Sequence, residues 1–173
     1  MKFSVFRIFF LLLIIAVLVS ENAFAQDEIY TDNDNKFVVA LTKDWVKTHS
    51  LSPIIKLSAV SAVRAASGRP IASFKISVTE VDADISINKY LKNSINTSRS
   101  MWSTKSETSL DSIPQENKFL VLEQKIGHLV KTVNRLYVKA NGNMFELSCS
   151  VSQPASTELI KACDDIINSF HIL

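Results

Sequence analysis

The sequence predicts an α+β protein built around an antiparallel sheet. Apolar and polar side chains alternate over residues 72–79, as in a strand with one buried face. Asn141 and Gly142 lie between two strand-like runs, and this pair favours a type I′ hairpin turn because both central residues need a positive φ. Residues 159–170 carry an apolar stripe at helical spacing, which predicts a helix packed on the sheet.

The first 25 residues are predicted to be an export signal. Lys2 and Arg7 form a basic start, Ile8–Val19 is an unbroken apolar run of 12 residues, and Ala23–Ala25 has the small-x-small pattern of a cleavage site. We expect the mature protein to begin near Gln26 and to be periplasmic or secreted.

A membrane anchor is the competing interpretation of this segment. A spanning helix needs about 20 apolar residues, whereas the run ends at Ser20. A lipid anchor is not expected, because no cysteine precedes Cys149. We therefore expect no membrane span after cleavage, and three parts: a signal peptide at 1–25, a flexible lead-in at 26–35 and a single domain at 36–173.

Composition and charge exclude several functional classes. The net charge is +2 and falls to +1 without the charges of the signal, so no basic footprint for nucleic acid is present. The three glycines are not clustered, which excludes a glycine-rich phosphate-binding loop. The densest basic stretch contains Lys125, Lys131, Arg135 and Lys139. We interpret it as the solvated side of a strand, and the alternative is an anion-binding surface.

The N-terminal half of the domain contains strand patterns. Phe37–Leu41 is a short apolar strand, and Trp45 after it is expected to be a core or rim anchor. An apolar segment at 54–63, a breaker cluster at 67–70 and the alternating strand at 72–79 together indicate a hairpin.

A helix is predicted after this hairpin. Asp84 or Ser86 can cap it, and its apolar residues recur at i, i+3 and i+4 until about Arg99. Met101 and Trp102 are expected to close it against the sheet.

The C-terminal half is predicted to contain strands at 106–113, 119–126, 129–140 and 144–151. In the last of these strands, four alternate residues should point into the core: Phe145, Leu147, Cys149 and Val151. Ser156 or Thr157 caps the closing helix, whose apolar stripe consists of Leu159, Ile160, Cys163, Ile166, Ile167 and Phe170.

Both cysteines fall on these core-facing positions. Cys149 lies on the last long strand, and Cys163 lies on the helix that must fold back over it. Two cysteines with none left over in an exported protein favour a disulfide. The alternative is a pair of buried, reduced thiols that act as small apolar side chains.

No catalytic, metal-binding or cofactor-binding residue is expected. No histidine stands at helical spacing from another metal ligand; the three are His49, His128 and His171. Two carboxylate pairs could be proposed as acid/base pairs: Asp82 with Asp84, and Asp164 with Asp165. The first pair is better explained as charge at a helix start, and the second as part of a solvated helix face. The Asn96–Ser98 acceptor pattern for glycosylation lies in a predicted helix and is treated as chance.

Several segments together resemble the PsbP-like superfamily, which includes the PsbP extrinsic subunits of photosystem II, Mog-type Ran-binding factors and bacterial DcrB-like envelope proteins. The resemblance spans nearly all of the mature chain and rests on Phe37–Leu41 with Trp45, Tyr90-Leu91, Tyr137 with Asn141-Gly142, Phe145–Cys149 and Ile166–Phe170. A proline usual just before the tryptophan and a DcrB-like lipid-attachment cysteine are missing.

This resemblance implies a central antiparallel sheet flanked by helices on both faces, an α/β/α sandwich, and a non-enzymatic binding or assembly role. It carries over no ligand residue. We therefore expect an exported, non-catalytic module of the cell envelope that has an unknown envelope protein as its partner and no cofactor. The alternatives are a small secreted hydrolase and a small-ligand carrier with an apolar cleft between Trp45, Trp102 and the sheet.

Overall fold

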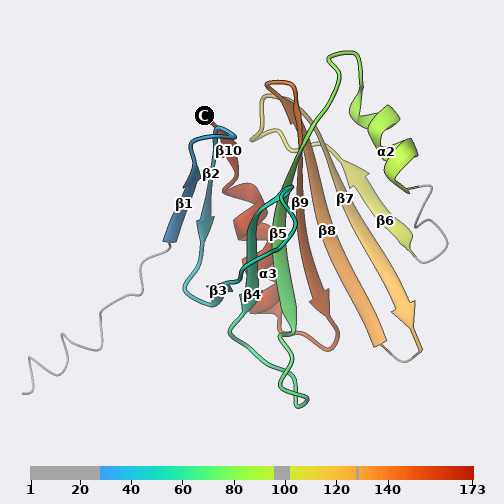
Figure 1. Ribbon diagram of the computed structural model, residues 1–173. Helices are drawn as coiled ribbons and strands as arrows, with labels where there is room; N and C mark the ends of the chain where they lie inside the picture. Colours follow the sequence, from blue (N-terminus) through green and yellow to red (C-terminus); the bar gives the residue numbers. More distant parts are fainter. Residues whose placement is uncertain (1–27, 96–101, 128) are drawn as a thin grey trace, which may run out of the picture.

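The computed structural model describes residues 28–95, 102–127 and 129–173 (Figure 1). The predicted signal peptide, the end of the first helix near Arg99, Met101, His128 and the glycosylation pattern at Asn96–Ser98 lie outside these residues. Among the helices of the described residues, none has both the length and the apolar character that crossing a membrane requires.

The main sheet has seven strands in the order β3-β4-β5-β9-β8-β7-β6, and each neighbouring pair is antiparallel. The bounds of these strands are β3 Trp45–Lys47, β4 Ile55–Ser61, β5 Ala72–Glu80, β6 Ser103–Thr108, β7 Glu116–Ile126, β8 Leu129–Ala140 and β9 Asn143–Ser152. The β8–β9 turn confirms the predicted hairpin, because Asn141 and Gly142 have φ values of 52° and 73°.

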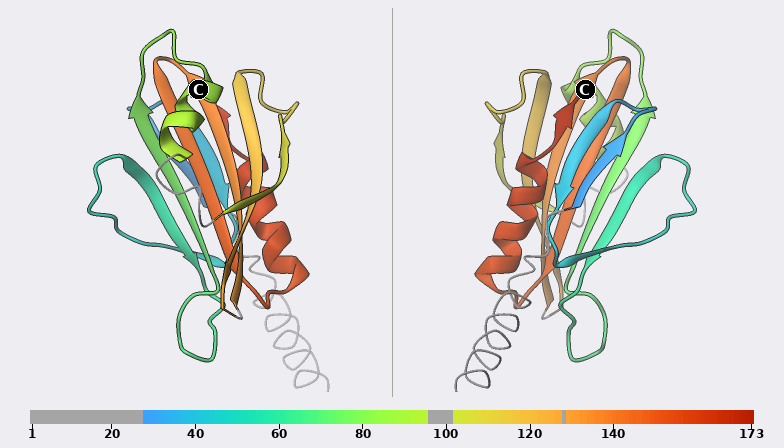
Figure 2. Two further views of the ribbon diagram at one scale, coloured as in Figure 1. Left: turned by 90° about the vertical axis from the view of Figure 1, so that its right-hand side faces the viewer. Right: turned by 90° about the vertical axis from the view of Figure 1, so that its left-hand side faces the viewer.

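A smaller sheet has the order β1-β2-β10, with β1 at Glu28–Asp32, β2 at Phe37–Leu41 and β10 at His171–Ile172. The helices are α2 at Ile87–Ile95 and α3 at Thr157–Asn168. Helix α3 and the small sheet lie side by side on one face of the main sheet (Figure 2).

The main core lies between that face, α3 and the small sheet. Phe37, Phe145 and Phe170 form its aromatic centre, with ring centroids 5.7 to 6.0 Å apart. Trp45 is 7% exposed and packs edge-on against Phe74, so its expected role as an anchor is confirmed. Alternate residues of β5 and β9 point into this core as predicted: Ala72, Phe74, Ile76, Val78, Phe145, Leu147, Cys149 and Val151.

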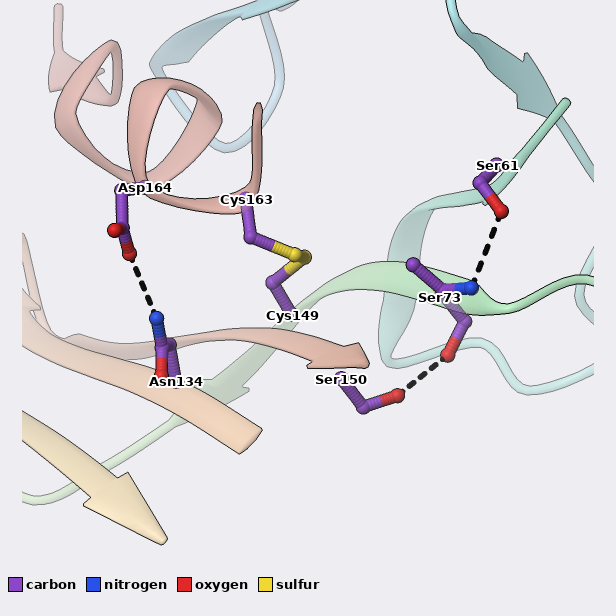
Figure 3. The surroundings of a disulfide bond; sticks show 8 residues. Ser61, Ser73, Asn134, Cys149, Ser150, Cys163 and Asp164 are labelled. Carbon is purple, nitrogen blue, oxygen red and sulfur yellow. Dashed lines mark hydrogen bonds between the residues drawn. A yellow bond between two sulfur atoms is a disulfide. The ribbon is translucent and has the colours of Figure 1, made fainter. Parts of the chain in front are cut away.

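A disulfide between Cys149 and Cys163 joins β9 to α3 (Figure 3). The two Cα atoms are 5.7 Å apart. Ser156 caps α3 by accepting a hydrogen bond from the backbone N–H of Leu159. Ile160 was expected in the buried stripe but is 37% exposed. Its position, about 100° around the helix from Leu159, places it beyond the edge of that stripe.

Residues 28–32 correct the expectation of a flexible lead-in at 26–35, because they form β1 and pair with β2. The Tyr30 ring lies 5.9 Å from that of Phe37, and its hydroxyl donates to the carbonyl of Lys56. The Asp32 carboxylate accepts hydrogen bonds from the backbone N–H groups of Asp34 and Asn35, which form the turn into β2.

The strand expected at 106–113 is also displaced, because β6 ends at Thr108. The side-chain amide of Asn117 accepts from the N–H of Leu110 and donates to the carbonyls of Leu110 and Ile113. These bonds hold a turn where the apolar residues suggested a strand. Ile113 is nevertheless buried in the core.

Helices flanking both faces of the sheet, as the resemblance implied, are not supported. On the face opposite the main core, α2 covers only part of the sheet: it packs mainly against β7 and β8, and Met144 at the start of β9 joins the same cluster. Ser86 caps this helix, and Ile87 and Leu91 cover Leu122 and Tyr137. The rest of this face, on β5 and β9, carries serine and charged side chains, which an apolar helix stripe cannot cover favourably.

Candidate binding groove on the polar face of the sheet

Most of the positions considered from sequence do not form a site. His49 and His171 are exposed, and neither forms an ion pair with a carboxylate within the described residues. Asp82 and Asp84 are exposed before α2. Asp164 accepts from the side chain of Asn134 at 2.7 Å, and its pKa is raised by burial. Across the described ranges, no cluster of three His, Cys, Asp or Glu residues could hold a metal ion.

A groove of about 320 Å³ instead lies on the side of the main sheet that α3 does not cover. Its floor consists of alternate residues from three adjacent strands: Ser73 to Ser77 of β5, Glu146 to Ser150 of β9 and Lys131 to Arg135 of β8. Ile54 and Ile55 line it on one side, and Trp102 lines it on the other. We call this cavity the polar groove.

Strand register places the polar side chains in rows across the floor. Lys75, Ser148 and Arg135 are cross-strand neighbours, and Ser77, Glu146 and Tyr137 form the adjacent row. Side chains opposite each other in such rows are within about 4.5–5.5 Å at Cβ and interact directly.

The hydroxyls of Ser73 and Ser150 are hydrogen-bonded at 2.8 Å, and they point away from the disulfide in Figure 3. Cys149 lies between Ser148 and Ser150 along β9, and its side chain points to the opposite face. The disulfide therefore supports the strand that forms the middle of the groove floor.

Arg135 is the central charged residue of the groove. Its Nη1 lies 3.6 Å from a carboxylate oxygen of Glu146 and donates to the Tyr137 hydroxyl at 3.4 Å. Its guanidinium carbon lies 5.9 Å from the centre of the Trp102 ring, within the range of a cation–π contact. Its Nε is buried and forms no hydrogen bond within the described part of the chain.

Burial changes the acid–base behaviour of these groups. It raises the pKa of Tyr137 to about 12, and the Glu146 charge adds to this effect. Burial also raises the pKa of Glu146, although Arg135 and the Tyr137 hydroxyl oppose the shift. The pKa of Lys131 is lowered, first by burial and then by the charges of Lys75 and Arg135.

A second cavity of about 400 Å³ lies beside the polar groove, and Trp102 and Arg135 line both. Leu91 of α2 and Leu120 of β7 line the apolar part of this second cavity. The side chain of Lys118 contacts Glu107 there, so this cation is already paired within the protein. In the polar groove, neither Lys75 nor Lys131 forms an ion pair within the described residues.

Sequence reasoning found part of this site. Lys131 and Arg135 belong to the basic stretch interpreted as the solvated side of a strand, and the structure places both on that side. Lys75 and Glu146 were not singled out, although the alternation over 72–79 and 144–151 predicts that they face away from the core. Their meeting depends on strand order, which no local pattern specifies.

The apolar cleft expected between both tryptophans for a ligand carrier does not form. Trp45 belongs to the main core, whereas Trp102 packs with the α2 cluster on the other face. Of the two tryptophans, Trp102 lines the polar groove and Trp45 does not.

The arrangement of strands and helices is shared by several solved structures. Cyanobacterial PsbP from Synechocystis sp. PCC 6803 is 14% identical, with a TM-score of 0.65 over 88% of this chain and 95% of that one. The Saccharomyces cerevisiae Ran-binding protein Mog1p is 7% identical, with a TM-score of 0.60 over 86% of this chain and 96% of that one. The chain has a PsbP-like, Mog-type fold.

LpqN of Mycobacterium tuberculosis, described as involved in cell envelope biogenesis, has the same PsbP-like fold. It is 15% identical, with a TM-score of 0.62 over 91% of this chain and 96% of that one. No protein-family model matches the sequence, and no curated protein is similar to it. At these identities the likeness shows the fold alone, so the site must be argued from its own residues.

Proposed function

We propose that this protein is an exported, non-catalytic binding or assembly module of the cell envelope, and that the polar groove is its binding surface. The observation that carries the proposal is a charged, serine-lined sheet face that neither helix covers at its centre. Concave sites with a few converging polar groups beside apolar walls are typical of binding surfaces.

Export is supported by the predicted signal at residues 1–25 and by the disulfide, because structural disulfides persist in oxidising compartments. The Ran-binding description of Mog1p and the envelope description of LpqN support a binding or assembly role for a chain with this fold. We expect the binding partner to be another component of the envelope.

Cross-linking in the native envelope tests the proposal. Affinity-tagged wild-type protein is compared with two variants. Lys75→Glu reverses one charge in the groove, and Lys161→Glu reverses an exposed charge on α3, outside the groove. We expect the same cross-linked component with wild type and Lys161→Glu, and its loss with Lys75→Glu.

Circular dichroism and thermal melting of the three proteins provide the folding control. The proposal would be refuted if the wild-type protein reproducibly captures no envelope component. Equal capture by Lys75→Glu would exclude the groove as the binding surface.

A further inference from the structure

The polar groove carries more positive than negative charge. Three cations line it, Lys75, Lys131 and Arg135, whereas Glu146 is its one carboxylate among the described residues. Glu146 is already engaged by Arg135 at 3.6 Å. Neither Lys75 nor Lys131 forms an ion pair within the described chain. Two positive charges in the groove therefore lack an ionic partner among the described residues.

These two lysines come from strands on either side of β9. Lys75 is on β5 and lies directly opposite Ser148, while Lys131 is on β8 two residues before Val133, the neighbour of Ser150. The charge of Lys75 is close enough to lower the pKa of Lys131, an effect that adds to burial. A negative group in this position would offset repulsion between the two ammonium groups.

Size and lining limit what that negative group can belong to. A volume of about 320 Å³ suits a small molecule. Trp102, Ile55 and Val133 provide apolar contact around the charged floor. A small acid with an apolar or ring-shaped part would match both the charge and the lining.

We propose that the polar groove binds a small organic acid, whose carboxylate or phosphate group lies between Lys75 and Lys131 beside the Ser148 hydroxyl, and whose apolar part contacts Trp102. This inference rests on the proposed role of the groove as a binding surface, and it adds the chemistry of the ligand. Lysine acts here as a positive point charge, which accepts either acidic group.

Fluorescence of Trp102 gives a direct measurement in the full mature protein. The Trp45→Phe substitution removes the second fluorescent tryptophan. It also removes a buried indole N–H that has no hydrogen-bond partner among the described residues. Four probes are titrated into this protein: phenyl phosphate, benzoate, inorganic phosphate and uncharged benzyl alcohol. We expect saturable fluorescence changes with phenyl phosphate and benzoate at millimolar concentrations or below. The acid that binds more tightly shows whether the groove prefers a phosphate or a carboxylate.

The apolar contact predicts weaker binding of inorganic phosphate, and the charge requirement predicts no saturable binding of benzyl alcohol. In the same background, Lys75→Gln combined with Lys131→Gln should weaken binding of the preferred acid at least about tenfold, as the loss of charge-assisted contacts implies. Lys125→Gln together with Lys161→Gln removes the same amount of charge outside the groove and should leave affinity within about twofold.

Three results would overturn the inference: no saturable change with either acid, equal affinity for benzyl alcohol, or equal affinity in the two double variants. Thermal melting confirms that each variant is folded. If Lys75→Glu loses the cross-linked envelope component while neither acid binds wild-type protein, the binding role stands and the small-acid ligand is refuted. If the acid binds but no component is captured, the ligand stands and the assembly role is refuted.

Discussion

Arg135 shows how one side chain organises the floor of the groove. It contacts Glu146, Tyr137 and Trp102, which come from β9, β8 and the segment before β6. A half-buried carboxylate such as Glu146 is unfavourable without a nearby cation. The ion pair therefore explains how a charged residue is retained beside the buried Tyr137.

The substitution Arg135→Met removes this cation while keeping much of the side-chain volume. We expect the free energy of unfolding to fall by about 1–3 kcal/mol at pH 7, because Glu146 loses its charged partner. The pKa of Glu146, already raised by burial, should rise further. As pH falls, the folded variant takes up a proton on Glu146 before the unfolded chain does, so the penalty should shrink at pH 5.

Urea unfolding of wild type and Arg135→Met at both pH values measures this effect. The Glu146→Gln background provides the matched control, in which the same arginine replacement should cost less and depend less on pH. A penalty that stays constant with pH would contradict the assignment to Glu146.

The disulfide is the main connection at the scale of elements. It joins α3 to β9 across a sequence separation of 14 residues. The sequence predicted this bridge because both cysteines fell on core-facing positions of consecutive elements and because the first 25 residues predict an export signal. The core-facing positions followed from local periodicity and the signal from local composition, so no long-range information was needed.

Reducing this bridge should lower the free energy of unfolding by about 3 kcal/mol, as the chain-entropy model gives for a loop of this length. Denaturant unfolding with and without reductant measures the change. Cys149→Ala combined with Cys163→Ala is the control and should show no response to reductant. Hydrogen exchange should quicken in α3 more than in β8, and equal quickening throughout would contradict a local clamp.

Strand β1 shows what local patterns could not predict. Its sequence is polar, and its order depends on Tyr30 reaching Phe37 and the carbonyl of Lys56, the latter 26 residues away. The turn at Asp32 adds hydrogen bonds to two backbone N–H groups. Composition indicated a loose segment, whereas these tertiary contacts order it.

Asp32→Ala should therefore destabilise the protein by about 1–2 kcal/mol, because the β1–β2 turn loses its carboxylate acceptor. Asp34→Ala is a matched control, since the exposed Asp34 contributes its backbone N–H to this turn and that group is unchanged. Thermal or urea unfolding of the two variants measures the difference. Similar stability for both would contradict the assigned role of Asp32.

At the scale of the whole molecule, the two faces of the main sheet have different roles. One face carries the core, α3 and the small sheet, and among the described residues α2 covers part of the other face, mainly at β7 and β8. The class and the strands at the centre of the sheet followed from periodicity. The extent of helix coverage did not, because it depends on where each helix packs in three dimensions.

The proposed export makes a prediction about the whole chain. The protein recovered from the producing cell should begin at Gln26, because cleavage is expected after Ala25. Intact mass measurement without reductant should also show the mass of the mature chain less two hydrogens, as the disulfide requires. A retained N-terminal segment would favour the membrane-anchor interpretation instead.

The two ends of the main sheet have a further consequence for behaviour at high concentration. Strand β3 has three residues, and β6, with the sequence STKSET, has six exposed residues and no large apolar side chain. Lys105 on β6 pairs with Glu123 of β7 and keeps charge at this border. Short or charged border strands disfavour pairing with another chain. The borders of the main sheet should therefore disfavour edge-to-edge association between copies of the protein, even while its polar face stays open.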